Sequence, residues 1–185
     1  MIRSFVGLTL AAPILDRLDP LAFGVPGARW VERRNLHLTL VFLGEVEEGV
    51  LGEFAQDLAE SVAAVPAFRL GVEGLGTFGQ AKPRALWAGV AADPALDHLQ
   101  GKIAGLAARH GIEIDRRKFV PHITLARLTN PPSERLAAFI AGNSPFKGGE
   151  MDVGAVALFE SRLGREGAEY SVLAEYGLGT SPTFP

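Results

Sequence analysis

Two short segments of the sequence share a pattern of residue types that could handle a phosphate group. The pattern His-x-Thr-Leu begins once at His37 and again at His122. Both copies lie in apolar runs typical of β-strands, and successive side chains on a strand point to opposite faces. His37 and Thr39 therefore share one face, as do His122 and Thr124, while the residue between them faces the core. Each motif thus predicts an imidazole and a hydroxyl on a non-core face.

Two such pairs facing each other across a cleft would suit in-line phosphoryl chemistry. Opening a cyclic phosphodiester needs one group to take a proton from water and another to give a proton to the departing sugar oxygen. Imidazoles have an ordinary pKa of about 6.5 and can hold both roles near neutral pH. The threonine hydroxyls would donate hydrogen bonds to the non-bridging oxygens. A structural duplication could retain the leucines, but it gives no reason to keep His and Thr twice.

A metal site is the main alternative for these histidines. No third ligand from Asp, Glu or His lies at typical spacing beside either motif. The chain has no cysteine, which excludes thiol nucleophiles and thiolate metal centres. We therefore expect neither a metal ion nor another cofactor.

Arg127 is a further candidate whose position on its strand is ambiguous. It follows His122 by five residues, so regular alternation places it on the core side. It reaches the cleft if the strand ends or bulges there, and otherwise it serves a structural ion pair. The same alternation places Phe42 on the core face together with Leu38 and Leu40.

Basic and aromatic residues near the motifs have both functional and structural explanations. Basic runs at residues 33–34 and 116–118 precede the two motifs. They could attract an RNA backbone, and a solvated strand end explains them equally well. Four aromatic residues could stack on a base, although a core position is the preferred explanation. They are Phe5, Phe42, Phe78 and Trp87.

Composition limits the kind of partner. The 185 residues include 18 Lys and Arg against 21 Asp and Glu, a net charge of −3, which argues against coating long nucleic acids by charge alone. An RNA end or a small cyclic nucleotide remains as substrate. No apolar run is long enough to cross a bilayer, and residues 2–9 suit a first strand better than a signal peptide. We expect a cytoplasmic monomer without membrane contact.

The order of expected elements repeats along the chain. Strand, helix, strand, strand occurs over residues 36–91 and again over residues 122–175. A duplicated α+β unit follows, because each short sheet needs helices on one face and a partner on the other. We expect one bilobal domain over residues 1–185, with motif lobes at roughly 30–92 and 112–176.

The motifs and their surroundings resemble a known family. The segments WVERRNLHLTLVFLGE at residues 30–45 and FVPHITLARL at residues 119–128 are similar to the 2H phosphoesterases, in particular the LigT-like RNA 2′,3′-cyclic phosphodiesterases, also called ThpR. The resemblance extends to residues 78–90 and 158–173. It implies a bilobal α+β fold with two antiparallel sheets, flanked by helices, around a central cleft with pseudo-twofold symmetry.

The resemblance also implies an activity and residue roles. A terminal 2′,3′-cyclic phosphate of RNA would be hydrolysed to a 2′-phosphomonoester without metal. His37 would be the proton donor and His122 the proton acceptor, with Thr39, Thr124 and Arg127 binding substrate. Reverse 2′–5′ RNA ligation, another cyclic nucleotide or 2′–5′ oligonucleotide as substrate, and a non-catalytic RNA- or nucleotide-binding module stay open as alternatives.

Overall fold

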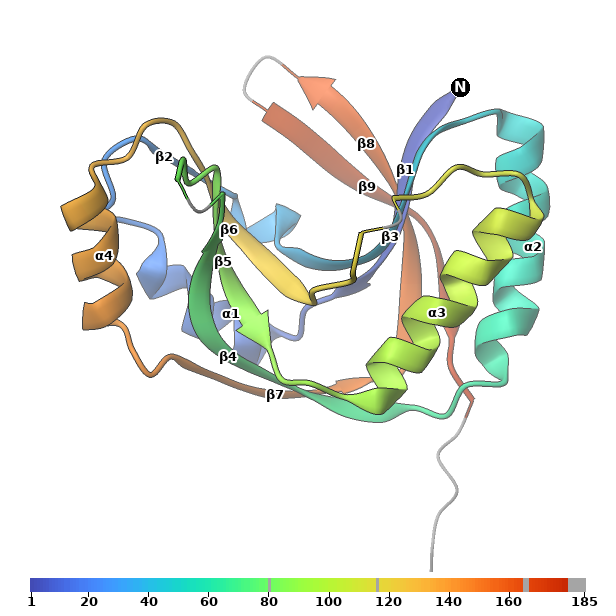
Figure 1. Ribbon diagram of the computed structural model, residues 1–185. Helices are drawn as coiled ribbons and strands as arrows, with labels where there is room; N and C mark the ends of the chain where they lie inside the picture. The colour runs from blue at the N-terminus through green and yellow to red at the C-terminus, as the bar shows by residue number, and fades with distance from the viewer. Residues whose placement is uncertain (80, 116, 165–166, 180–185) are drawn as a thin grey trace, which may run out of the picture.

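The computed structural model describes residues 1–79, 81–115, 117–164 and 167–179. These residues form an α+β structure, as the sequence predicts (Figure 1). Short 3₁₀ turns lie at Asp19–Leu21 and Arg33–Asn35. The longer elements, in chain order, are β1 (Ile2–Thr9), α1 (Ala12–Leu18), β2 (Ala28–Trp30), β3 (His37–Val46), α2 (Glu48–Ala63), β4 (Phe68–Phe78), β5 (Ala85–Val90), α3 (Pro94–Arg109), β6 (His122–Leu128), α4 (Ser133–Gly142), β7 (Lys147–Val153), β8 (Ala155–Gly164) and β9 (Gly167–Gly177).

The strands form one curled antiparallel sheet (Figure 1). Its order is β7-β4-β5-β6-β3-β1-β8-β9, and β2 pairs with β6 outside this path. The halves β7-β4-β5-β6 and β3-β1-β8-β9 meet at β3 and β6, which share one register pair, Leu38 opposite Ile123. The two antiparallel sheets expected from the sequence are therefore the two halves of one sheet. The seam between the halves passes through both motifs.

Each half of the sheet takes strands from distant parts of the chain. The predicted order of strand, helix, strand, strand is present in the first unit, as β3-α2-β4-β5. The second unit, β6-α4-β7-β8-β9, has one strand more than predicted, because the chain divides at Gly154 into β7 and β8. However, β3 pairs with β1, whereas β4 and β5 belong to the half that contains β6. The lobe ranges 30–92 and 112–176 therefore do not coincide with the sheet halves. The organisation of the chain as a single bilobal domain stays a prediction.

Helices α2 and α3 pack side by side at one end of the sheet, and α1 packs on β7 (Figure 1). The α3 helix begins as predicted: the Asp93 side chain accepts hydrogen bonds from the N–H groups of Ala95, at 2.7 Å, and Leu96, at 3.3 Å. Gly111 follows its last turn with a φ of +69°, which suits glycine. Among the described residues, no helix has the length and apolar character needed to cross a bilayer.

The core lies between these helices and the sheet face that carries Leu38 and Ile123, opposite the face of the motif histidines. Burying one aliphatic or aromatic side chain in this core contributes about 1.5–3 kcal/mol to the stability of the fold. The helices and the motif strands therefore hold each other in place. Side chains at 0% exposure come from both motif strands and from both long helices: Leu38, Ile123, Phe54, Leu58, Val62, Leu96, Leu99 and Ile103.

Candidate active site

The two motifs meet at the seam of the sheet. Leu38 and Ile123, the second residues of the motifs, lie directly opposite each other and are fully buried. In an antiparallel pair, the next position along one strand lies opposite the previous position along the other. Each motif histidine therefore lies across from the threonine of the other motif. The two motifs are related by a local twofold axis through the Leu38 and Ile123 pair, and their polar side chains share the non-core face.

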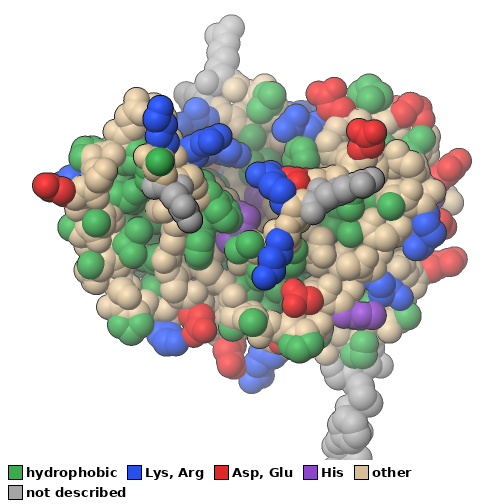
Figure 2. Space-filling model, in the orientation of Figure 1, with side chains coloured by type: hydrophobic (Ala, Val, Ile, Leu, Met, Phe, Trp, Pro, Cys, Tyr) green, Lys and Arg blue, Asp and Glu red, His purple; other side chains and the backbone are tan. Residues whose placement is uncertain are grey.

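This register also sets the spacing of the two imidazoles. His37 and His122 are diagonal neighbours across the seam, and diagonal Cα atoms in an antiparallel pair are about 7–8 Å apart. Figure 2 shows histidine side chains inside a hollow in the middle of one face, with Lys and Arg side chains gathered around it. A group of the size of a phosphate can therefore contact both rings at once.

Backbone carbonyl groups fix the tautomer of both rings. The Nδ1–H of His37 donates to the carbonyl oxygen of Asn35 at 2.7 Å, and that of His122 donates to the carbonyl oxygen of Val120 at 2.7 Å. In each case the acceptor lies two residues before the histidine. Nε2 is left as the nitrogen that can gain or lose a proton. In His37 this nitrogen lies 3.1 Å from Oγ1 of Thr39.

Aromatic rings enclose both histidines. The ring centroids of Phe5, Tyr170 and Phe159 lie 4.7, 4.8 and 5.7 Å from that of His37. The rings of Phe78 and Trp87 lie 4.7 and 6.4 Å from that of His122. Phe5 is a core residue at 2% exposure, as expected, whereas Phe78 is 36% exposed and the core interpretation is wrong for it.

Burial changes the acid–base behaviour of both imidazoles. Desolvation lowers the pKa of His37 below its ordinary value, and the positive charge of His122 lowers it further. Desolvation likewise lowers the pKa of His122. In both rings the hydrogen bond to the backbone carbonyl opposes this change by favouring the charged form. Both histidines therefore exchange their proton at a lower pH than an exposed histidine does.

A β-bulge in each motif strand decides where Arg127 points. The fourth motif residue, Leu40 or Leu125, has no register partner on the neighbouring β1 or β5. It and the residue after it are both buried, so the alternation of faces is reset. Arg127 consequently returns to the cleft face, which is the bulge alternative raised by the sequence. Phe42 occupies the equivalent place after the first motif and is 41% exposed, so its predicted core position is wrong for the same reason.

Two cavities flank the motif residues. The first, about 420 Å³, we call the arginine cavity; its walls include Arg29, Asn35, Arg127, Glu169 and Tyr170. The second, about 570 Å³, we call the aromatic cavity; its walls include Thr39, Phe42, Phe78, Phe119 and His122. The first adjoins His37 through Asn35 and Tyr170, and the second includes His122 itself. The two histidines, which the local twofold axis relates, therefore lie beside cavities of different chemistry.

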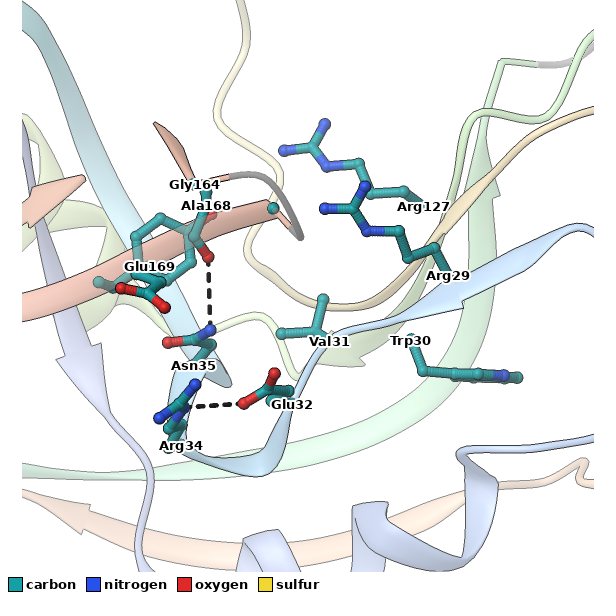
Figure 3. A pocket seen from close by; sticks show the side chains of 12 residues that line it. Arg29, Trp30, Val31, Glu32, Arg34, Asn35, Arg127, Gly164, Ala168 and Glu169 are labelled. Atoms are coloured by element: carbon teal, nitrogen blue, oxygen red, sulfur yellow. Dashed lines mark hydrogen bonds and ion pairs between the residues drawn. The ribbon is translucent and has the colours of Figure 1, made fainter. Parts of the chain in front are cut away.

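Several of these residues were not predicted from the sequence. Arg29, Asn35 and Tyr170 carry no motif of their own. They line one cavity only because β2, the 3₁₀ turn before β3, and β9 meet there. Figure 3 shows Arg29 and Asn35 on its wall. Asn35 precedes the first motif by two residues, which is the one local signal that could have identified it.

The two basic runs have divided roles in the structure. Arg33 forms ion pairs with Asp16, at 2.7 Å, and with Asp19, and so holds the 3₁₀ turns together. In the second run, Arg117 and Lys118 line the aromatic cavity, whereas Arg116 lies outside the described residues. Within the described ranges, no three His, Asp or Glu side chains gather as metal ligands would.

The chain is similar to known proteins over almost its whole length. A family model for the 2′-5′ RNA ligase superfamily matches residues 10–165. An RNA 2′,3′-cyclic phosphodiesterase of Aquifex aeolicus is 32% identical over 185 residues, which cover 97% of this chain and 98% of that protein. One of the same name from Thermotoga maritima is 36% identical over 168 residues, covering 89% and 86%.

Solved structures show the same architecture. The crystal structure of E. coli LigT complexed with 3′-AMP matches with a TM-score of 0.77 and 27% identity, covering 96% of this chain and 98% of that one. The crystal structure of TT0787 of Thermus thermophilus matches with a TM-score of 0.81 and 28% identity, covering 97% and 99%.

Proposed function

The chain belongs to the 2′-5′ RNA ligase superfamily, and from this we propose that it is an RNA 2′,3′-cyclic phosphodiesterase that converts a terminal cyclic phosphate to a 2′-phosphomonoester. The names of its relatives in Aquifex aeolicus and Thermotoga maritima support this activity. The observation that carries the proposal is the register pair of Leu38 and Ile123, because it brings two His–Thr pairs onto one face about a local twofold. The enzyme acts on RNA ends as a cytoplasmic monomer.

In the proposed reaction, proton transfer at two imidazoles accompanies in-line displacement at phosphorus. Nε2 of His122 takes a proton from water as its oxygen forms a bond to phosphorus. The bond from phosphorus to O3′ breaks on the opposite side, and Nε2 of His37 gives its proton to O3′. The phosphate stays on O2′. The carbonyl contacts of both Nδ1 atoms keep each Nε2 directed at this exchange.

The other motif residues stabilise charge on the phosphate. The hydroxyls of Thr39 and Thr124 donate to its non-bridging oxygens, where negative charge must be held in the transition state. Arg127 adds a guanidinium on the same face of the sheet. The choice of His37 as acid and His122 as base follows from the resemblance of the two motifs to those of the 2H phosphoesterases. The local twofold axis by itself makes the two rings equivalent.

We expect hydrolysis of a short RNA ending in a 2′,3′-cyclic phosphate to proceed in the presence of excess EDTA. The proposed proton transfers and phosphate contacts use side chains alone, so chelation removes nothing that the reaction needs. Product analysis by ³¹P NMR should show only the 2′-phosphomonoester. Loss of turnover in EDTA that zinc or manganese restores would instead favour a metal-dependent reaction.

We expect the pH profile of kcat/KM to be bell-shaped, with both inflections below about pH 6.5. His122 must be neutral to accept a proton, so the rate falls when the pH drops below its pKa. His37 must be protonated to donate, so the rate falls when the pH rises above its pKa. Burial lowers both pKa values, which moves both limbs to the acid side. A profile that still rises above about pH 7 would contradict this assignment.

A further inference from the structure

We propose that the aromatic cluster of Phe5, Phe159 and Tyr170 stabilises the imidazolium form of His37, and that this makes His37, and not His122, the proton donor. The inference rests on the proposed function, in which one imidazole gives a proton and the other takes one. It gives Phe5, a residue outside both motifs, a positioning role that acts through His37.

The proposed reaction needs the two histidines in opposite charge states. His37 must keep its proton at a pH at which His122 has lost its own. Burial and the positive charge of His122 both lower the pKa of His37, whereas burial is the cause that lowers the pKa of His122. Another feature on the His37 side must therefore favour the charged ring.

The polar contacts of the two rings do not supply this difference. Each Nδ1–H donates to a backbone carbonyl oxygen two residues earlier, at 2.7 Å in both cases. Nε2 of His37 lies 3.1 Å from Oγ1 of Thr39. This hydroxyl can donate to a neutral imidazole or accept from an imidazolium, so it serves both forms of the ring.

Carboxylates do not supply the difference either. Among the described residues, none forms an ion pair with His37, and His122 is the one group whose charge changes the pKa of His37. The other charged or titratable side chains of the surrounding strands and of the arginine cavity are Arg3, Arg29, Glu32, Arg34, Arg127, Glu169 and Tyr170.

The aromatic rings around His37 are arranged to favour a cation. The ring centroid of Phe5 lies 4.7 Å from that of His37, with 30° between the ring planes. At this separation and tilt the two rings overlap face to face, because rings lying side by side would be farther apart. The face of an aromatic ring is negative and attracts a cation within about 6 Å of its centroid. Phe159, at 5.7 Å, and Tyr170, at 4.8 Å, also lie within this range.

His122 has different aromatic surroundings. The ring of Phe78 lies 4.7 Å away but stands at 85° to the imidazole. The ring of Trp87 lies 6.4 Å away and is tilted by 57°. Among the described residues, therefore, no ring lies nearly parallel to His122 as Phe5 does to His37.

Strand register explains why the local twofold is broken at this point. Phe5 of β1 is the register partner of Phe42 on β3. Arg127 occupies the place on β6 that is equivalent to Phe42, and its partner on β5 is Ala85. The position beside the first motif thus carries a phenyl ring, whereas the equivalent position beside the second motif carries a methyl group.

The cluster is held in place before any substrate binds. Phe5 and Phe159 are register partners on β1 and β8, and their rings stack at 4.7 Å with 8° between the planes. Their exposed fractions are 2% and 6%. The ring of Tyr170 stands edge-on to Phe5 at 5.3 Å and 88°. Because these rings are desolvated, their attraction for a cation is stronger than at an exposed site.

The test changes the electron density of the Phe5 ring and keeps its shape. Phenylalanine analogues with one, three or five fluorine atoms, incorporated at position 5, make the ring face progressively less negative. We expect the pKa of His37, from an NMR titration of its imidazole without substrate, to fall along the series by about one pH unit in all. The alkaline limb of the kcat/KM profile should move to lower pH by the same amount. The titration repeated in His122→Gln should show the same trend without the charge of His122.

The same analogues at Phe54 provide the matched control. Phe54 is a fully buried residue of α2 whose ring lies 5.9 Å from that of His110, and its fluorination should leave the pKa of His37 unchanged. Circular dichroism of each variant reports whether the fold is intact. A pKa of His37 that stays constant along the Phe5 series, or that moves equally in the Phe54 series, would overturn the inference. Movement of the acid limb alone would show that His37 is the base, and would overturn it as well.

The titration also separates this inference from the proposed function, because it needs no substrate. If no cyclic phosphate is hydrolysed but the pKa of His37 falls along the Phe5 series, the function fails and the stabilised imidazolium stands. If a cyclic phosphate RNA end is hydrolysed but the pKa of His37 does not respond to the Phe5 ring, the function stands and the inference fails.

Discussion

We expect His37→Ala to lower kcat/KM for a cyclic phosphate RNA end by about 10²–10⁴-fold, and a substrate with sulfur in place of the bridging O3′ to restore most of this loss. Without His37 the sugar oxygen must leave as an alkoxide, which is a poor leaving group. A thiolate leaves without protonation, so the sulfur substrate has little need of the acid. The test measures kcat/KM of His37→Ala and of the unaltered enzyme on the ordinary and the sulfur substrate, at the pH optimum.

His122→Ala should lose activity to a similar extent and should gain little from the sulfur substrate, because it lacks the base and not the acid. His98→Ala removes an exposed histidine of α3 and serves as the matched control. Equal rescue of both active-site variants, or rescue of His122→Ala alone, would reverse or remove the assigned roles. Full activity in either variant on the ordinary substrate would contradict the two-histidine mechanism itself.

We expect Thr39→Val and Thr124→Val each to raise the activation barrier by about 2–4 kcal/mol, a fall in rate of about 30- to 1,000-fold. Valine keeps the shape and the strand preference of threonine, so the sheet should stay intact and only the hydroxyl donor is lost. Kinetic measurements report the loss of the hydroxyl donor, and circular dichroism of the same variants reports whether the sheet is intact. Thr129→Val, at an exposed position just after β6, is the control.

The two threonine variants should differ in one respect. The Thr39 hydroxyl lies 3.1 Å from Nε2 of His37, so Thr39→Val also removes a contact of the proposed acid. The alkaline limb of the pH profile should therefore move in Thr39→Val, but it should stay in place in Thr124→Val. Normal kinetics in both variants would leave the threonines with a role in strand formation alone.

The local features of the motifs could be predicted because they depend on backbone geometry within a few residues. Alternation along a strand predicted that Leu38 and Ile123 face the core, and both are fully buried. The Asp93 cap of α3 and the glycine that follows that helix were likewise predicted from neighbouring residues and are confirmed. The α+β class followed from the order of such elements.

The predicted alternation of side-chain faces was wrong where pairing with a neighbouring strand introduces a bulge. The bulges at Leu40 and Leu125 exist only against β1 and β5, which come from other parts of the chain. Nothing within residues 37–43 distinguishes a regular strand from a bulged one, because adjacent apolar residues fit either. Phe42 was therefore assigned to the wrong face, and the sequence left the position of Arg127 open.

Alternation along each strand was enough to predict two His–Thr pairs, each on the polar face of its strand, in an α+β fold. That the pairs meet at Leu38 and Ile123, and that Arg29 and Tyr170 line one cavity beside His37, depends on how distant segments pack. Side-chain alternation is set by the backbone of the strand itself. Strand pairing and cavity shape are set by packing between segments far apart in the chain, and many such pairings are compatible with the same local pattern until the whole core is assembled.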